Sequence, residues 1–170
     1  MIKNPRYPVV LFDWGDTVMY DDPTSTVPMV DWPSVRVVEG VADLLTYLKD
    51  SGRQMIIATS ATVSDEDQVR AALRRAGIDS YFSKIYCFKN TGISKSEAYY
   101  RHILKDLNIP ASDVLMVGDS FPRDVQAANM AGIYAVWFSE VSDETLKGKL
   151  YTTVHSMQEL QALFKSWDKK

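Results

Sequence analysis

Short, continuous runs of apolar residues recur along the chain and predict β-strands. The four clearest runs, each followed by a polar or small residue, are 9–12, 55–58, 114–117 and 134–138. Two weaker runs are 85–88 and 152–154. Apolar runs without alternation are typical of strands that are covered on both faces, as in a parallel sheet. The pattern therefore predicts a buried parallel sheet of four to six strands.

Apolar residues at helical spacing lie between these runs and predict helices. The segments with this spacing are 41–48, 69–76, 99–107, 125–131 and 160–167. Gly52 stands where the first helix should stop, Ser64 is expected to open the second, and Ser156 with Glu159 predicts a capping box at the last. Because strands and helices alternate, we predict a doubly wound, Rossmann-like α/β fold in three layers (α/β/α). Its right-handed crossovers would bring the strand ends to one edge.

The length of the chain, 170 residues, predicts a single domain over 1–170. The segment 19–36 is the one long irregular stretch, with three prolines and three aspartates. It is longer than an ordinary connection needs but too short for a separate cap domain. We therefore expect it to be a flap over the functional site that is mobile and lies outside the core.

Composition and charge exclude several classes of function. The formal net charge is −3, and the nearest approach to a basic stripe, Arg70, Arg74 and Arg75, is typical of a solvated helix face, so we predict no nucleic-acid-binding patch. No apolar run reaches the roughly 18 residues of a membrane span. Residues 1–8 are too polar for a signal peptide, and a single cysteine, Cys87, builds no disulfide framework. A cytoplasmic protein with no membrane partner is the expectation.

Residues that can carry chemistry follow three of the predicted strands. Asp13 ends the first, Thr59 and Ser60 follow the second, and Asp119 follows a third, with Asp124 shortly after it. Carboxylates gathered at one edge repel one another unless a cation lies among them. Hard oxygen ligands suit Mg²⁺, and a carboxylate can serve as the nucleophile in phosphoryl chemistry. The pattern therefore predicts a magnesium site that holds a phosphate against Asp13.

Four motifs occur in order along this pattern. They are the strand ending in Asp13-Trp-Gly-Asp-Thr17, the strand ending in Thr59, Lys95 before a predicted helix, and Gly118-Asp119-Ser-Phe-Pro-Arg-Asp124. Over about residues 8–164 they resemble the motifs of the haloacid dehalogenase superfamily of aspartate-nucleophile phosphohydrolases. The resemblance implies the HAD-like fold, hydrolysis of a phosphate monoester and Mg²⁺ as cofactor. It implies a phosphorylated small molecule or macromolecule as partner.

The resemblance also implies roles for the acidic residues. Asp13 would attack phosphorus and become an aspartyl phosphate. The Asp13 carboxylate, the Gly15 backbone carbonyl and the Asp119 carboxylate would bind Mg²⁺. Asp124 would complete the metal site, either as a ligand or by orienting the metal waters or the site lysine.

The phosphoryl oxygens would be held by other groups. By the same resemblance, Thr59 and backbone amides near Asp13 would bind them, and Lys95 would offset their charge. Ser60 lies near enough to touch the substrate. Lys89 is a rival for the site lysine, and we favour Lys95 because it directly precedes a helix.

Gly15 is the departure from the family pattern. Most phosphatases of this family carry an aspartate at that position, and it protonates the leaving oxygen and later activates water. Here the acid appears one residue later, so Asp16 is the candidate catalytic acid. Adjacent side chains point apart in an extended or turn backbone, and we therefore expect Asp16 to bond to the loop or the flap instead.

Two alternatives to a phosphatase remain open. One is a hydrolase that expels another leaving group, such as a halide or a phosphonate carbon. The other is a catalytically weakened member that binds phosphate or a protein partner. Since no full-sized cap covers the site, a large substrate or a neighbouring subunit of a homo-oligomer could do so, and both readings stay open.

Overall fold

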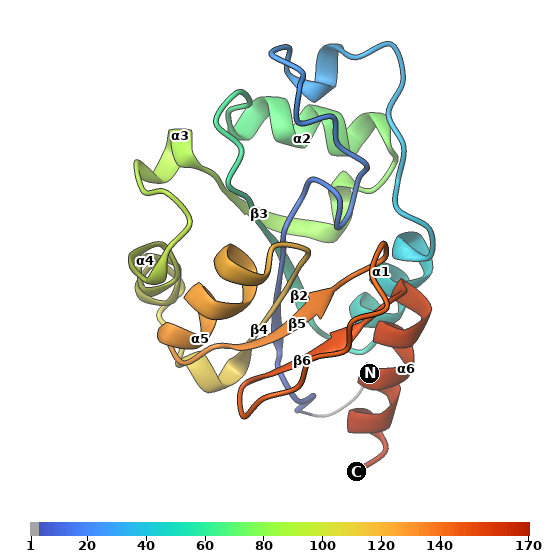
Figure 1. Ribbon diagram of the computed structural model, residues 1–170, viewed down its shortest axis with the longest axis vertical. Coiled ribbons are helices and arrows are strands. Elements are labelled where there is room, and N and C mark those ends of the chain that lie inside the picture. Colours follow the sequence, from blue (N-terminus) through green and yellow to red (C-terminus); the bar gives the residue numbers. More distant parts are fainter. Residues whose placement is uncertain (1–3) are drawn as a thin grey trace.

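A six-stranded parallel sheet forms the centre of the protein, as seen in the computed structural model, which describes residues 4–170 (Figure 1). Its strands are β1 (Val9–Phe12), β2 (Gln54–Ala58), β3 (Phe82–Tyr86), β4 (Val114–Gly118), β5 (Tyr134–Phe138) and β6 (Tyr151–Val154). They lie in the order β3-β2-β1-β4-β5-β6, and every neighbouring pair is parallel. The predicted doubly wound α/β fold is confirmed.

The strand order reverses between β1 and β4, and this decides where the site can form. The chain runs outward from β1 through β2 to β3, then returns to the other side of β1 and runs outward again from β4. The register pairs Phe12 with Ile57 and with Val117, so three strands end together. Ligands bind at such a switch point, outside the carboxyl ends of the strands.

Helices cover both faces of the sheet (Figure 1). They are α1 (Val41–Asp50), α2 (Glu66–Arg75), α3 (Phe88–Thr91), α4 (Glu97–Leu107), α5 (Ala127–Met130) and α6 (Met157–Asp168). Val10 and Phe12 of β1 join a cluster with α1, α2 and α6, whereas Val9 and Leu11 join a cluster with α4 and α5. Successive side chains of a strand point to opposite faces, so the side chains of one strand pack into two separate hydrophobic clusters. None of the helices in residues 4–170 is long and apolar enough to cross a membrane.

Helix ends agree with the sequence in part. The Ser156 side chain accepts the Glu159 amide at the start of α6, and Gly52 has a φ of 84° just after α1. The prediction for α2 is wrong by one residue, because Asp65, and not Ser64, caps it through a reciprocal capping box with Gln68. Aspartate is as good an N-cap as serine.

Two further elements differ from the expectation. The third strand ends at Tyr86 and not at 88, because Cys87 begins the cap of the short helix α3. The helix expected over 125–131 begins earlier, as a π-helical turn over Phe121–Gln126 that continues into α5. Single π-turns are frequent at functional sites, and this one carries Asp124.

The segment 19–36 is anchored to the domain at several points. Met19 and Met29 are buried in the core cluster that includes residues of α1 and α2, so the expectation that the segment lies outside the core is wrong for these two side chains. Arg75 of α2 donates to the carbonyl oxygens of Val30 and Trp32, at 2.8 and 2.7 Å. One short 3-10 helix, Met29–Asp31, packs on α2. The mobility of the segment stays a prediction.

Replacing Arg75 with alanine should loosen this segment. The substitution removes these two hydrogen bonds, each contributing about 0.5–1.5 kcal/mol, and a longer one to the Pro33 carbonyl at 3.4 Å. Amide exchange at Asp31 and Trp32 should therefore become roughly 10- to 100-fold faster. Hydrogen exchange followed by mass spectrometry or NMR measures this. Arg74→Ala is the control, because that side chain is exposed and, within the described part of the chain, forms an ion pair only with Asp79. Equal protection in both variants would contradict the proposed anchor.

Candidate active site

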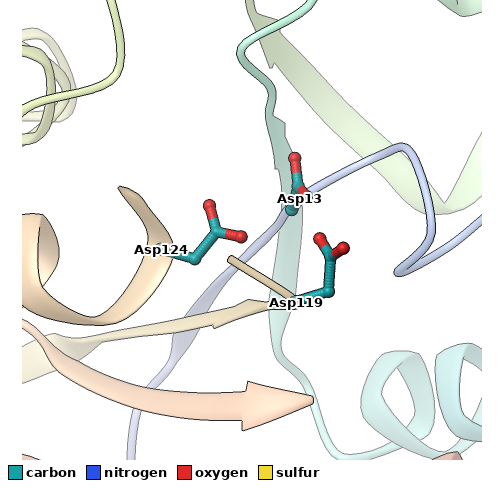
Figure 2. Close-up of side chains that lie close together, drawn as sticks. All are labelled: Asp13, Asp119 and Asp124. Carbon is teal, nitrogen blue, oxygen red and sulfur yellow. The ribbon is translucent and has the colours of Figure 1, made fainter. Parts of the chain in front are cut away.

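Three of the predicted carboxylates meet at the ends of two neighbouring strands (Figure 2). Asp13 directly follows β1, Asp119 directly follows β4, and Asp124 comes from the π-helical turn. One carboxylate oxygen of each lies within 4.8 Å of the others. Asp13 and Asp124 are buried, and Asp119 is exposed. The sheet edge therefore holds three acidic groups close together, two of them buried and one exposed to solvent.

Lys95 lies between two of these carboxylates. Its Nζ donates to Oδ1 of Asp13 at 3.0 Å and to Oδ1 of Asp124 at 2.7 Å, and its side chain is 1% exposed. Lys89 is exposed, and its Nζ donates to the carbonyl oxygen of Val63. The structure thus brings Lys95 to Asp13 and leaves Lys89 away from it.

Burial and mutual repulsion perturb the pKa values of these groups. Burial raises the pKa of Asp13 to about 6, against the lowering effect of Lys95 and with a further contribution from Asp119. Burial also raises the pKa of Asp124 to about 6, helped by Asp13 and opposed by Lys95. Burial lowers the pKa of Lys95, but the two carboxylates outweigh it, so the net shift is upward. One lysine does not compensate three carboxylates, and the site favours an additional cation.

The raised pKa values predict how stability depends on pH without metal. The ordinary pKa of both carboxyls is 3.8, so between about pH 4 and 6 the folded protein holds protons that the unfolded chain has lost, and stability falls as the pH rises through this range. We expect Asp13→Asn to show a smaller fall than the parent protein when melting is followed in EDTA from pH 4.5 to 7.5. Identical pH profiles would show that Asp13 does not titrate in this way.

Gly118 allows the close approach of Asp124. A side chain at position 118 would overlap the Asp124 carboxyl group, with its Oδ2, Cγ and Cβ all too near. The Ser120 amide donates to the same Oδ2 at 2.9 Å. Both oxygens of Asp124 are thereby engaged, one by Lys95 and one by the backbone, which suits a residue that positions Lys95 more than one that binds a metal.

Thr59 presents its hydroxyl group to the same space. The residue is 3% exposed, and Oγ1 accepts the Ala61 amide at 3.0 Å. Within residues 4–170 its hydroxyl hydrogen has no acceptor, so it is free to donate to a ligand. Tyr99 fixes the strand end by donating to the Thr59 carbonyl at 3.1 Å. Ser60, next in the chain, accepts from Arg123 at 3.4 Å.

A pocket of about 330 Å³ opens above these groups. Four parts of the chain line it: the turn after β1, the loop after β2, the segment 19–36, and Asp119 with Arg123 after β4. The predicted site residues in its lining are Asp13, Gly15, Asp16, Thr59, Ser60 and Asp119. The volume is that of a small-molecule site.

Asp21, in the segment 19–36, lies against the turn at Gly15 and was not among the predicted site residues. Asp16 has a φ of 57°, and its Oδ1 accepts the Asp21 amide at 3.0 Å, so Asp16 bonds to the segment 19–36, as expected. A Cβ at Gly15 would lie 2.9 Å from Oδ2 of Asp21. The segment 19–36 thus places a carboxylate next to the point where a side chain of residue 15 would begin. The only sequence signal was the acidic character of this segment.

The residues present fit a hard divalent cation. Asp13 and Asp119 supply carboxylate oxygens from adjacent strand ends, and the Gly15 carbonyl oxygen accepts no hydrogen bond from the part of the chain that the structure describes. An all-oxygen donor set of this kind is typical of Mg²⁺.

Comparisons with known proteins agree with this geometry. Glyceraldehyde 3-phosphate phosphatase of Pyrococcus abyssi is 28% identical over 105 residues, which are 61% of this chain and 43% of that protein. Ribulose-1,5-bisphosphate 5-phosphatase of Halopiger xanaduensis is 30% identical over 112 residues, which are 64% and 46% of the two chains. The chain thus spans somewhat under half the length of these curated relatives.

Solved structures share the fold at low identity. A protein of Listeria monocytogenes serotype 4b superposes with a TM-score of 0.81 at 23% identity, over 95% of this chain and 99% of that one. The HAD-hydrolase YfnB of Bacillus subtilis, solved with bound magnesium, gives 0.72 at 16% identity, over 94% and 99%. Residues 26–138 match the family described as haloacid dehalogenase-like hydrolase, which is more than half of the chain. The chain therefore belongs to the haloacid dehalogenase-like hydrolases.

Proposed function

We propose that this hydrolase is a Mg²⁺-dependent phosphatase that cleaves phosphate monoesters through Asp13. The observation that carries the proposal is the buried Asp13 carboxylate, with Lys95 on one oxygen and Asp119 close by at the next strand end. The phosphatase names of the sequence relatives support it. We further propose that the segment 19–36 acts as a flap, because it supplies one wall of the pocket.

The side chains divide the chemistry among them. The Asp13 oxygen that Lys95 does not engage attacks phosphorus, so that a bond forms between Asp13 and phosphorus while the bond to the leaving oxygen breaks. The Thr59 hydroxyl and the Lys95 ammonium stabilise the phosphoryl oxygens as negative charge develops on them. Water then attacks phosphorus, which releases inorganic phosphate and restores the Asp13 carboxylate.

Asp13, Asp119 and the Gly15 carbonyl would hold the metal ion. Bound Mg²⁺ supplies charge neutralisation for the phosphoryl group and for the carboxylates around it. Asp124 acts on this arrangement as a positioning residue, because it fixes the Lys95 ammonium at 2.7 Å.

A generic aryl phosphate tests the proposal. We expect the protein to hydrolyse p-nitrophenyl phosphate with Mg²⁺ and to lose this activity in EDTA. The absence of a carboxylic acid at Gly15 favours one alternative, a weakened member that binds phosphate without turnover. Binding of inorganic phosphate or vanadate without any hydrolysis of the aryl ester would support that alternative and contradict the phosphatase.

Mg²⁺ should raise the melting temperature, because a bound dication relieves the repulsion among the carboxylates. At about 100 times its Kd a ligand stabilises the native state by ~2.7 kcal/mol, which corresponds to roughly 5–10 °C for a chain of this size. Asp119→Asn should remove most of this rise. Asp67→Asn, an exposed carboxylate on α2, should keep it. A melting temperature indifferent to millimolar Mg²⁺ would contradict the metal assignment.

A further inference from the structure

The outer half of the pocket presents three carboxylates that share one feature. Asp16, Asp21 and Asp22 each use only Oδ1 within the protein, to accept the Asp21 amide at 3.0 Å, the Asp22 amide at 2.9 Å, and the Thr24 amide at 3.0 Å and hydroxyl at 2.6 Å. Among the residues that the structure describes, none donates to Oδ2 of any of the three. The local hydrogen bonds fix these side chains and leave three oxygens for a ligand.

The charge around these oxygens is negative. Among residues 4–170, Arg123 is the only cationic side chain in the pocket lining, and its guanidinium group is directed to the hydroxyls of Ser120 and Ser60, at 3.3 and 3.4 Å. Burial is the main cause that raises the pKa of Asp21; the hydrogen bond from the Asp22 amide opposes it, and the Asp16 and Asp22 carboxylates add to it. A second anionic group on a substrate would meet repulsion here, since like charges brought together at a site are costly.

Apolar and aromatic surface completes the same wall. Met29 and Trp32 of the flap line the pocket beside the carboxylates. The indole Nε1 of Trp32 donates to the Ser25 hydroxyl at 3.1 Å and to the Val27 carbonyl at 3.0 Å, so the ring is held in place. Ammonium groups bind favourably where carboxylates and an aromatic ring lie together.

Asp21 lies beside the turn that follows Asp13. Its Oδ2 is 2.9 Å from the place where a Cβ on Gly15, two residues after Asp13, would begin. A group bound to it is therefore attached to the leaving side of an ester whose phosphorus faces Asp13. The buried Thr59 hydroxyl and the Lys95 ammonium fix the anionic end of the ligand independently of these carboxylates.

We infer that the site selects phosphate monoesters whose alcohol part carries an ammonium group, with Asp21 as the principal specificity-determining residue. The inference rests on the proposed phosphatase function and names its substrate class. The pocket of about 330 Å³ has room for a small alcohol part of this kind. Esters with a second phosphate or a carboxylate in that part are disfavoured.

Three esters of similar size and different charge test this inference. O-phosphoethanolamine carries an ammonium group, propyl phosphate is uncharged beyond its phosphate, and 2-phosphoglycolate carries a carboxylate. At fixed Mg²⁺ concentration and ionic strength, we expect kcat/KM for the ammonium ester to exceed that of propyl phosphate at least about tenfold, with the carboxylate ester lowest. One favourable charge contact of ~1.4 kcal/mol gives this factor.

Asp21→Asn keeps the shape of the side chain and removes its charge. The preference is measured as the ratio of kcat/KM for the ammonium ester to kcat/KM for propyl phosphate within one variant. We expect the substitution to reduce this ratio at least about fivefold, because it removes the principal charge contact. Asp31→Asn, an exposed flap carboxylate outside the site pocket, should leave the ratio unchanged. An unaltered ratio in Asp21→Asn would overturn the role of Asp21.

The outcomes separate this inference from the proposed function. Hydrolysis of all three esters at equal kcat/KM would overturn the inference and leave the phosphatase intact. If no ester is hydrolysed, the phosphatase fails, and binding decides the inference: 2-aminoethylphosphonate should then bind tighter than propylphosphonate and phosphonoacetate in a thermal-shift titration. Equal binding of the three phosphonates would overturn it as well.

Discussion

Replacing Asp13 with asparagine is expected to abolish hydrolysis of phosphate esters. Asparagine keeps the shape of the side chain but lacks the anionic oxygen that would form the bond to phosphorus. Removal of a covalent nucleophile lowers kcat by roughly 10⁴-fold or more. The measurement is steady-state hydrolysis of p-nitrophenyl phosphate with saturating Mg²⁺, with the variant purified apart from any active enzyme.

A loss of activity must be separated from a loss of fold. Asp13 is buried and paired with Lys95, so the substitution changes the charge balance of the interior, and circular dichroism and the melting temperature need to accompany the kinetics. Asp16→Asn is a matched control, because Asp16 is an exposed neighbour in the same turn. We expect it to keep far more activity than Asp13→Asn. A folded Asp13→Asn protein with a tenth or more of the parent activity would exclude Asp13 as the nucleophile.

Replacing Lys95 with methionine is expected to cost both stability and activity. The substitution leaves the buried Asp13 and Asp124 carboxylates without their shared cation, and breaking a buried ion pair from one side typically costs about 3–5 kcal/mol. Without Lys95 the pKa of both carboxyls should rise further, so the loss should be smaller at pH 5, where they take up protons, than at pH 8. Urea unfolding at the two pH values measures this.

Lys89→Met is the matched control for this prediction. Lys89 is exposed, and its only described contact is a 3.2 Å hydrogen bond to the Val63 carbonyl. We expect the free energy of unfolding of the Lys89→Met variant to change by less than about 0.5 kcal/mol, and its activity to be preserved. Comparable losses in the two variants would contradict the assignment of Lys95 to the site.

The strand ends were predictable because their signal is local. Continuous apolar runs mark parallel strands, and parallel strands of one sheet end at the same edge, so Asp13, Thr59 and Asp119 had to lie near one another once the fold class was known. Lys95 was harder to place. Its reach to Asp13 depends on the path of the chain between α3 and α4, and the sequence favoured it over Lys89 only by its place before a helix.

The flap could not be predicted to the same depth. Its contacts are made between residues distant in sequence, such as Arg75 with the Val30 carbonyl, and an irregular segment has no periodicity that reports its buried face. The sequence pattern therefore did not indicate that Met19 and Met29 pack into the core. The position of Asp21 against Gly15 follows from this path, and it appears only in three dimensions.

Trapping the covalent intermediate tests the central claim most directly. The protein is mixed with a phosphate monoester and Mg²⁺, quenched in acid during turnover, and reduced with borohydride, which converts an aspartyl phosphate to homoserine. The account predicts homoserine at position 13 in the peptide map, only when both ester and Mg²⁺ were present. Continued turnover with the trapped residue elsewhere, or with Asp13 unmodified, would contradict it.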